Sequence, residues 1–219
     1  MIVSDIPYSN VPVLSTANTA AEALLLMQEN SLAHLPVVSE EKIEGIISID
    51  SLRNMSADNM LSGIRNSFIL VQALDYHHFL SAVRIASLHN LSLVPVADVT
   101  DKYLGSITYS HLMNALSTYL DTDKSGGVIV LEMVKHDYSF GELCRLVETN
   151  DAHITQLNSH IDPSTGLLMV TIKVNKIEIS DIVATLQRYE YNVKYYFGEE
   201  SYENELKDNY ENLMAYLNV

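Results

Sequence analysis

Two short stretches of the sequence place the same kinds of residue at the same spacing. In GIISIDSL the glycine is followed three residues later by Ser48 and six residues later by Ser51, and GSITYSHL has Thr108 and His111 at those places. A glycine lets a ligand approach the backbone. A hydroxyl can bond a polar ligand, and the free N–H groups at the start of a following helix favour an anion. The pattern predicts a ligand-binding turn that is made twice.

The two turns belong to an internal repeat. Pro36 maps to Pro95 with an offset of 59, and Gly45 maps to Gly105 with an offset of 60, so the second copy has one extra loop residue. Each copy is predicted to run helix, strand, turn, strand, helix, and two such small units should pack around a pseudo-two-fold axis. Apolar residues at i, i+3, i+4 and i+7 mark the buried face of each first helix: Ala20, Ala23, Leu24 and Met27, and then Phe79, Ala82, Val83 and Ala86.

The pattern changes after a polar, glycine-rich linker, DTDKSGG. Beyond it, VIVLEMV is typical of a buried strand, and the alternation in LLMVTIKVN predicts a strand after a hairpin turn at Asp162–Gly166. NVKYYF predicts a final strand. The order β-α-β-β-α-β is that of a ferredoxin-like sandwich. Two apolar faces mark its helices: Phe140, Leu143, Cys144 and Val147, and then Ile179, Ile182, Val183 and Leu186.

The predicted class is therefore α/β (α+β), in five segments. The tail has one apolar stripe, which indicates an amphipathic helix that packs within the chain or in a dimer, or else against a partner protein. The boundaries are 1–60 for the first repeat, 61–120 for the second, 121–127 for the linker, 128–198 for the sandwich and 199–219 for the helix.

The repeats resemble CBS domains, which read as an apolar-Pro-apolar strand, a turn and then G-h-h-[ST]-x-x-D. The resemblance covers about the first 119 residues, and the pair is what that family calls a Bateman module. Residues 127–198 resemble an ACT domain, through their element order and HDYSFG where D-x-x-G is common. The layout is similar to that of acetoin-utilisation-type CBS–ACT regulatory proteins. The resemblance implies a non-catalytic, homodimeric sensor that binds AMP, ATP, NAD or S-adenosylmethionine between repeats and signals to the ACT-like domain or a protein partner.

The resemblance also implies which residues would bind. Asp137 and Gly141 mark the turn where ACT domains bind an effector, although a purely structural β-α turn is favoured here. His34 precedes the proline of the first repeat, and its plainer reading is an edge or solvent-facing histidine. The nucleotide-binding candidates are Pro7, Pro12, Ala33, His34, Pro36, Ser48, Asp50, Ser51, Arg53, Arg65, Ser92, Leu93, Pro95, Thr108, Ser110 and His111.

Both turns depart from the family pattern at the ribose-binding aspartate. Ser51 and His111 stand in its place, and Asp50 lies one position early, about 100° away on a helix. A carboxylate accepts both ribose hydroxyl protons, whereas neutral imidazole offers one acceptor. We therefore expect weak or altered binding, with Arg53 or Arg65 contacting a phosphate. Helix capping is an equal explanation of the hydroxyls, and the alternative function is a ligand-free assembly module.

Bulk properties disfavour other functions. The net charge is −15, from 13 Lys+Arg and 28 Asp+Glu, which disfavours nucleic acid and an anionic membrane surface as partners. Cys144 is the only cysteine, so we expect a core residue and no intrachain disulfide. His77 and His78 diverge on a helix and predict no metal site. No catalytic constellation is recognisable, so an enzyme acting through His34 or His111 is the least favoured reading. We expect a cytoplasmic protein that requires no cofactor.

Overall fold

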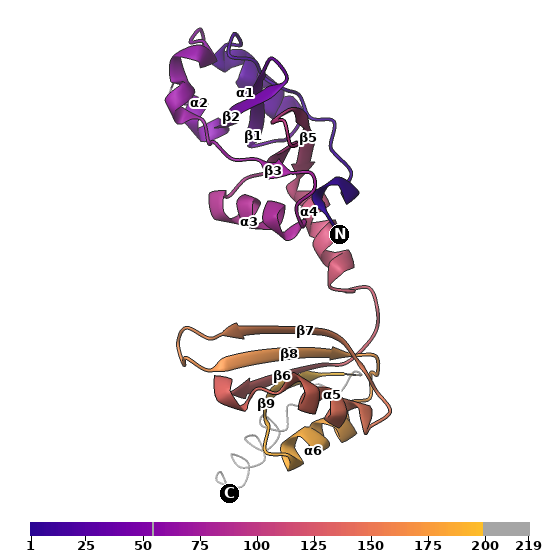
Figure 1. Cartoon of the computed structure of the whole chain (residues 1–219). Coiled ribbons are helices and arrows are strands. Elements are labelled where there is room, and N and C mark those ends of the chain that lie inside the picture. Colours follow the sequence, from indigo (N-terminus) through magenta and orange to yellow (C-terminus); the bar gives the residue numbers. More distant parts are fainter. Residues whose placement is uncertain (54, 199–219) are drawn as a thin grey trace, which may run out of the picture. The chain divides into compact units, whose positions relative to one another are not determined.

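The computed structural model describes residues 1–53 and 55–198, and the chain divides into two compact units. The first unit comprises Met1–Tyr119 and the second begins at Leu120. Figure 1 shows the helices and strands of both units. The predicted helix over 199–219 lies outside the described residues.

The first repeat follows the predicted order of elements. A short 3-10 helix, η1 (Val3–Asp5), precedes α1 (Ala20–Glu29), the antiparallel hairpin β1 (His34–Ser39) and β2 (Lys42–Ser48), the short α2 (Ile49–Arg53) and the 3-10 segment η2 (Leu61–Ser67). A capping box starts α1: the Thr19 side chain accepts from the Glu22 N–H, and the Glu22 carboxylate accepts from the Thr19 N–H. Of the predicted helix face, Ala20, Ala23 and Met27 are buried.

The second repeat reproduces this arrangement. It consists of β3 (Ala73–Leu74), α3 (Leu80–His89), β4 (Leu93–Ala97), β5 (Tyr103–Thr108) and α4 (Tyr109–Tyr119). Its hairpin keeps the register of the first, because Val37 pairs with Gly45 and Val96 pairs with Gly105. Both hairpins also have a bulge immediately after these pairs. The predicted duplication is therefore visible residue by residue.

Each repeat is completed by a segment that precedes the other one. We call residues 3–11 the first crossing segment and residues 63–71 the second. Ser9 forms a β-bridge with Ser106 of β5, and Ile69 forms one with Ile46 of β2. Ile69 lies 60 positions after Ser9, and Ile46 lies 60 positions before Ser106, so the two bridges are equivalent with the roles of the repeats exchanged. The two repeats are therefore related by a pseudo-two-fold exchange of these segments, which the hairpin pattern alone did not predict.

The crossing segments also carry core side chains. Val3 and Ile6 are buried in the cluster that contains Phe79, Val94 and Ile107 of the second repeat. In the reverse direction, the second segment buries one aromatic ring, Phe68, among the core residues of the first repeat. Burying apolar area is the main favourable term in folding, so each repeat depends on the other for part of its core.

The glycines of the two turns make this exchange sterically feasible. Gly45 has φ +145° and Gly105 has φ +152°, which is a region that residues with a Cβ rarely adopt. A Cβ on Gly45 would lie 2.8 Å from Phe68 Cβ, and a Cβ on Gly105 would lie 2.9 Å from Tyr8 Cβ. The backbone that the sequence pattern assigned to a ligand is thus approached by the chain's own crossing segments.

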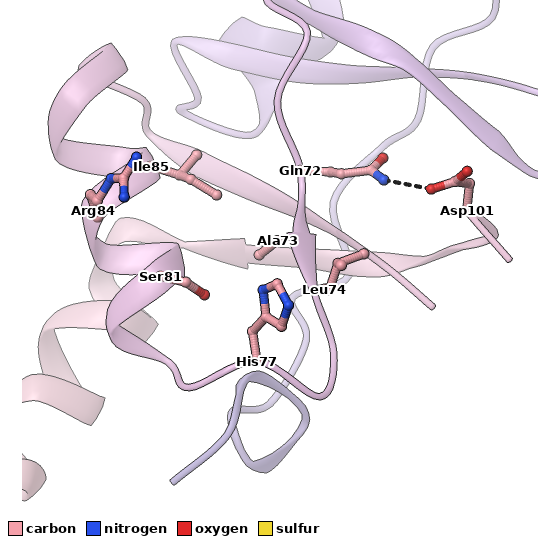
Figure 2. A pocket seen from close by; sticks show the side chains of 8 residues that line it. All are labelled: Gln72, Ala73, Leu74, His77, Ser81, Arg84, Ile85 and Asp101. Carbon is pink, nitrogen blue, oxygen red and sulfur yellow. Dashed lines mark hydrogen bonds between the residues drawn. The ribbon is translucent and has the colours of Figure 1, made fainter. Parts of the chain in front are cut away.

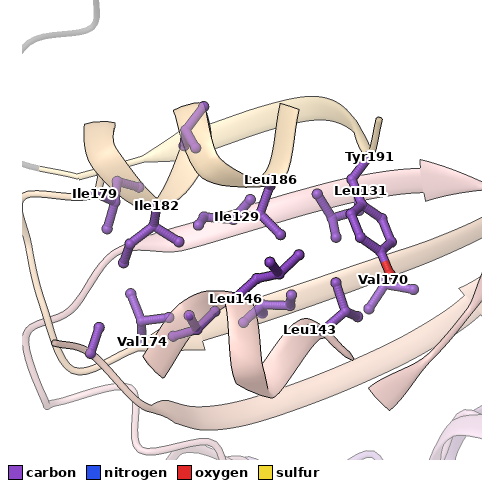
Figure 3. Close-up of a cluster of buried hydrophobic side chains, with 14 of the residues drawn as sticks. Ile129, Leu131, Leu143, Leu146, Val170, Val174, Ile179, Ile182, Leu186 and Tyr191 are labelled. Atoms are coloured by element: carbon purple, nitrogen blue, oxygen red, sulfur yellow. The ribbon is translucent and has the colours of Figure 1, made fainter. Parts of the chain in front are cut away.

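The second unit has the predicted ferredoxin-like order. Its elements are β6 (Val128–Met133), the 3-10 turn η3 (Lys135–Asp137), α5 (Phe140–Glu148), β7 (Ile154–Ile161), β8 (Leu168–Val174), α6 (Ser180–Arg188) and β9 (Asn192–Phe197). The antiparallel sheet has the order β7-β8-β6-β9. Both helices cover one face, where Ile129, Leu131, Leu143, Val170 and Leu186 are buried together (Figure 3). The predicted fold class is confirmed.

We predict that Gly45→Ala and Gly105→Ala each destabilise the first unit. The cost of the unfavourable backbone conformation is about 1–3 kcal/mol, and the clash with Phe68 or Tyr8 adds to it. Urea unfolding followed by circular dichroism measures the effect. Gly63→Ala is the matched control, because no atom lies within 4 Å of a Cβ built on Gly63. Equal midpoints for all three variants would contradict the role given to the two glycines.

Candidate functional site

Polar side chains from both repeats meet at the second turn. We use this term for Thr108, Ser110, His111 and the adjoining Ser9 of the first crossing segment. The Ser9 hydroxyl donates to Thr108 Oγ1 at 3.3 Å, and Ser9 Oγ lies 2.9 Å from His111 Nδ1. Thr108 Oγ1 is also 3.0 Å from Ser110 Oγ. The bridge from the Ser9 N–H to the Ser106 carbonyl, 2.7 Å long, holds this contact in place. The second turn is therefore a four-residue hydrogen-bonded cluster.

The first turn, Ser48–Ser51, has the same backbone but different contacts. Ser48 Oγ lies 2.9 Å from Ser51 Oγ and accepts the Ser51 N–H at 3.2 Å. This is the capping arrangement that the sequence left open for these serines. By the pseudo-symmetry, Ile69 stands where Ser9 stands at the second turn. The first turn thus lacks a polar contribution at the position that Ser9 holds.

The helices that follow the two turns also differ. The first turn leads into α2, which has only 5 residues, whereas the second leads into α4, which has 11. The N–H groups of the first helical turn have no intrahelical acceptor, and the helix dipole makes this end attractive to negative charge. The longer α4 presents such an end beside the hydroxyls of the second turn.

His34 of the first repeat contacts Ser92 of the second repeat. Its Nδ1 accepts the Ser92 N–H at 3.2 Å and lies 3.1 Å from Ser92 Oγ. The side chain is buried, with a relative exposure of 9%, so the reading as a solvent-facing histidine is wrong. Burial lowers the pKa of His34, and the charge of Asp50 partly opposes this shift. His34 is therefore a neutral acceptor at neutral pH.

The two predicted phosphate-binding arginines already have carboxylate partners. Arg53 lies 3.1 Å from Asp50, and Arg65 lies 3.8 Å from Glu44. Both arginines and Asp50 are exposed, and Glu44 is half-buried. Exposed ion pairs of this kind contribute about 0–1 kcal/mol, so a phosphate group could replace either carboxylate.

The other predicted residues are spread between strand interiors and surface. Pro36 and Pro95 are buried inside β1 and β4, as is Leu93. Pro7 and Ala33 are exposed, whereas Pro12 and Ser92 are half-buried. The strand residues shape the interior, which leaves the ends of the strands and the crossing segments for contact with a ligand.

A cavity of about 370 Å³ lies elsewhere in the second repeat, between β3 and α3. None of the nucleotide-binding residues predicted from the sequence lines it. Sequence analysis missed it because its lining residues are far apart in the chain; the one available signal was Arg84, one of five cations in residues 1–119. Its polar lining residues are Gln72, His77, Ser81, Arg84 and Asp101 (Figure 2).

In the second unit, the predicted effector turn is exposed at the start of α5. Asp137 ends η3, and Gly141 is the second residue of the helix, whose cap Ser139 accepts the Glu142 N–H. The Tyr191 hydroxyl donates to Glu142 Oε2 at 3.0 Å, and burial together with that carboxylate raises the pKa of Tyr191 to about 12. No atom lies within 4 Å of a Cβ built on Gly141. Packing therefore does not require this glycine.

Three general features of the described residues bear on other kinds of site. Cys144 is a half-buried free cysteine. The described ranges contain no group of three or more His, Cys, Asp or Glu residues placed to hold a metal ion. Among the helices that the structure describes, none has the length and apolar character needed to cross a bilayer.

Comparison with known proteins shows where the resemblance to CBS domains holds. The model of the CBS domain family matches residues 3–58. The homoserine O-acetyltransferase of Methanosphaera stadtmanae is 30% identical over 115 residues, which is 51% of this chain and 23% of that protein. The chain thus spans less than a quarter of the curated relative that it matches.

Two solved structures are similar to this chain at lower sequence identity. A CBS domain pair/ACT domain protein from Thermotoga maritima is 18% identical with a TM-score of 0.50, over 55% of this chain and 99% of that chain. A CBS domain pair crystallised with 5′-methylthioadenosine and S-adenosyl-L-methionine is 24% identical with a TM-score of 0.44, over 53% of this chain and 99% of that chain. The first likeness establishes the fold of a CBS domain pair.

We predict that His34 makes the first unit less stable in acid. Its pKa in the folded protein is lowered, so the unfolded chain binds a proton that the folded chain does not. Stability is therefore lost as the pH falls through the ordinary histidine pKa of about 6.5. Urea unfolding on either side of that pH should show a smaller acid loss for His34→Asn, whose amide oxygen can still accept the Ser92 N–H. His89→Gln, at an exposed position, is the control, and equal acid losses in wild type and His34→Asn would contradict the prediction.

We also predict that Gly141→Ala stabilises the second unit. Alanine is favoured over glycine inside a helix by about 0.5–1 kcal/mol, and the new Cβ meets nothing. Thermal unfolding followed by circular dichroism should show a higher midpoint. Gly127→Ala is the contrasting variant, because its Cβ would overlap the Ile179 side chain. A lower midpoint for Gly141→Ala would show that the glycine is needed by the fold itself.

Proposed function

Because residues 3–58 match the CBS domain family and the chain has the fold of a CBS domain pair, we propose that it is a non-catalytic regulatory protein that binds an adenosine-containing ligand between its repeats. The observation that carries the proposal is the second turn. Ser9 comes from the first crossing segment, whereas Thr108, Ser110 and His111 come from the second repeat. A ligand held there touches both halves of the module.

The second turn offers suitable partners for a nucleoside. Hydroxyl groups of a ribose can replace the Ser9 hydroxyl as partner of His111 and Thr108, because hydroxyls donate and accept alike. The imidazole of His111 offers the ligand one hydrogen-bonding nitrogen, whereas the carboxylate in the family pattern can accept hydrogen bonds from both ribose hydroxyls. We assign the flanks of the base to Pro7 in the first crossing segment, to Pro12 just after it, and to the strand start at Ala33 and His34.

The first turn suits a different group of the same ligand class. Arg53 and Arg65 lie on its side of the module, each paired with an exposed or half-buried carboxylate. Arginine binds phosphate with charge-assisted hydrogen bonds. A phosphate-bearing ligand is therefore assigned to Ser48, Ser51 and these arginines, and an uncharged nucleoside moiety to the second turn.

Regulation follows from a difference in affinity between two packings of the repeats. A ligand that binds one packing better shifts the population towards it. Residues 121–127 connect the pair to the ACT-like unit, which we propose receives the change and passes it to a protein partner. We further propose that the protein acts as a cytoplasmic homodimer.

A second candidate function is a ligand-free assembly module. Within each turn the hydroxyls are already hydrogen-bonded. Phe68 covers the backbone of Gly45, and Tyr8 covers that of Gly105. Neither turn has the family aspartate. In this reading the turns survive because they hold the repeats together.

Isothermal titration calorimetry with AMP, ATP, NAD and S-adenosylmethionine separates the two functions. We expect at least one of them to bind the wild-type chain, and His111→Asp to bind it about tenfold more tightly, since a hydrogen bond to a charged acceptor contributes about 1.5–3 kcal/mol and one to a neutral acceptor about 0.5–1.5 kcal/mol. Ser87→Asp adds the same charge at an exposed position of α3 and is the control.

The outcomes are distinct. Binding by His111→Asp or Ser51→Asp but not by the wild type would support the assembly module and contradict the sensor. Silence of the wild type and of both aspartate variants towards all four compounds would also remove the nucleotide proposal.

A further inference from the structure

The cavity between β3 and α3 differs in position and chemistry from the turns between the repeats. Its volume of about 370 Å³ lies within the usual size of small-molecule sites. Its apolar wall comes from Ala73, Leu74 and Ile85. Figure 2 shows polar side chains from three separate stretches of chain around this wall.

One polar group in the cavity is buried without a partner. Ser81 Oγ is enclosed, and the described part of the chain offers it no hydrogen bond. Burying a hydroxyl without a partner is unfavourable, and most serines in helices avoid it by pointing to solvent or bonding to the preceding turn. Ser81 lines the cavity, so a change of its χ1 rotamer would turn the hydroxyl towards an acceptor bound there.

The charged group on the same helix is also uncommitted. Among the described residues of the first unit, ion pairs involve Arg53, Arg65 and Lys102, and none involves Arg84. Arg84 is exposed, so its guanidinium is available to an anionic ligand. Ser81 and Arg84 are three positions apart in the sequence, which places them on one face of α3.

Two further residues define what the cavity accepts. His77 lines it beside Ser81, and its ring adds a hydrogen-bonding group. Asp101 lies on the far side from Arg84, where Gln72 Nε2 donates to its carboxylate at 3.0 Å. That carboxylate repels a second negative charge, so the lining favours a small ligand with a single anionic group at the Arg84 end.

We propose that this cavity is a second ligand site, which binds the carboxylate or phosphate group of a small anion through Arg84, Ser81 and His77. The site is built within the second repeat alone, and it is independent of nucleotide binding at the turns. The anionic group accepts from the guanidinium and from the Ser81 hydroxyl, and the remainder of the ligand lies against Leu74 and Ile85.

The test is a titration of the ¹⁵N-labelled chain with inorganic phosphate, with chloride added to hold the ionic strength constant. We expect saturable chemical-shift changes at the amides of Ser81, Arg84 and Ile85. Arg84→Gln should weaken the binding by about tenfold or more, because it removes a charge-assisted pair. Arg188→Gln removes the same charge in the second unit and should leave the curve unchanged.

A second variant separates ligand binding from a structural role. Ser81→Ala removes the unpartnered hydroxyl, so it should raise the midpoint of urea unfolding in chloride while weakening phosphate binding. Shifts that do not saturate, or one curve shared by the wild type and Arg84→Gln, would overturn the proposal. A repeat of the titration with acetate distinguishes a carboxylate site from a phosphate site, because the anion that binds with the higher affinity is the one that the site suits.

Discussion

The exchange of crossing segments between the repeats is the contact on which the first unit depends. Each segment pairs with the second hairpin strand of the opposite repeat and places apolar side chains in that repeat's core. This pairing needs a strand position without a Cβ, which Gly45 and Gly105 provide. The same pairing brings Ser9 to Thr108 and His111. Stability and the chemistry of the candidate site therefore have a common origin.

The two turns show how duplicated backbones diverge in side-chain chemistry. At equivalent places the first turn has Ile69 and Ser51, and the second has Ser9 and His111. The first turn leads into a helix of 5 residues and the second into one of 11. A pseudo-symmetric module therefore need not have two equivalent sites, because packing imposes the symmetry while a few half-buried side chains at the turns differ.

Sequence reasoning predicted those features that local patterns determine. Helix faces such as Ala20, Ala23 and Met27, the offset between the hairpins and the ferredoxin-like order all follow from periodicity. It could not predict that Tyr8 and Phe68 approach the glycines, because the crossing segments have no period of their own and pair with strands far away in the chain. Of the candidate site residues, the sequence indicated the turn hydroxyls, but the contact between Ser9 and His111 depends on that long-range pairing. The burial of His34 and the cavity at Arg84 are likewise tertiary properties.

Under the proposed function, the position of Ser9 couples ligand binding to the packing of the repeats. A ligand at the second turn competes with the Ser9 hydroxyl for Thr108 and His111, while the backbone bridge between Ser9 and Ser106 can remain. A ligand that binds only the paired arrangement stabilises it by RT ln(1 + [L]/Kd). Because the first crossing segment also places Val3 and Ile6 in the core of the second repeat, this free energy acts on the packing of both repeats. The first turn has Ile69 in place of Ser9, so a ligand there would displace no hydrogen bond from a crossing segment. Such a ligand would be coupled to the packing of the repeats only through Arg53 and Arg65.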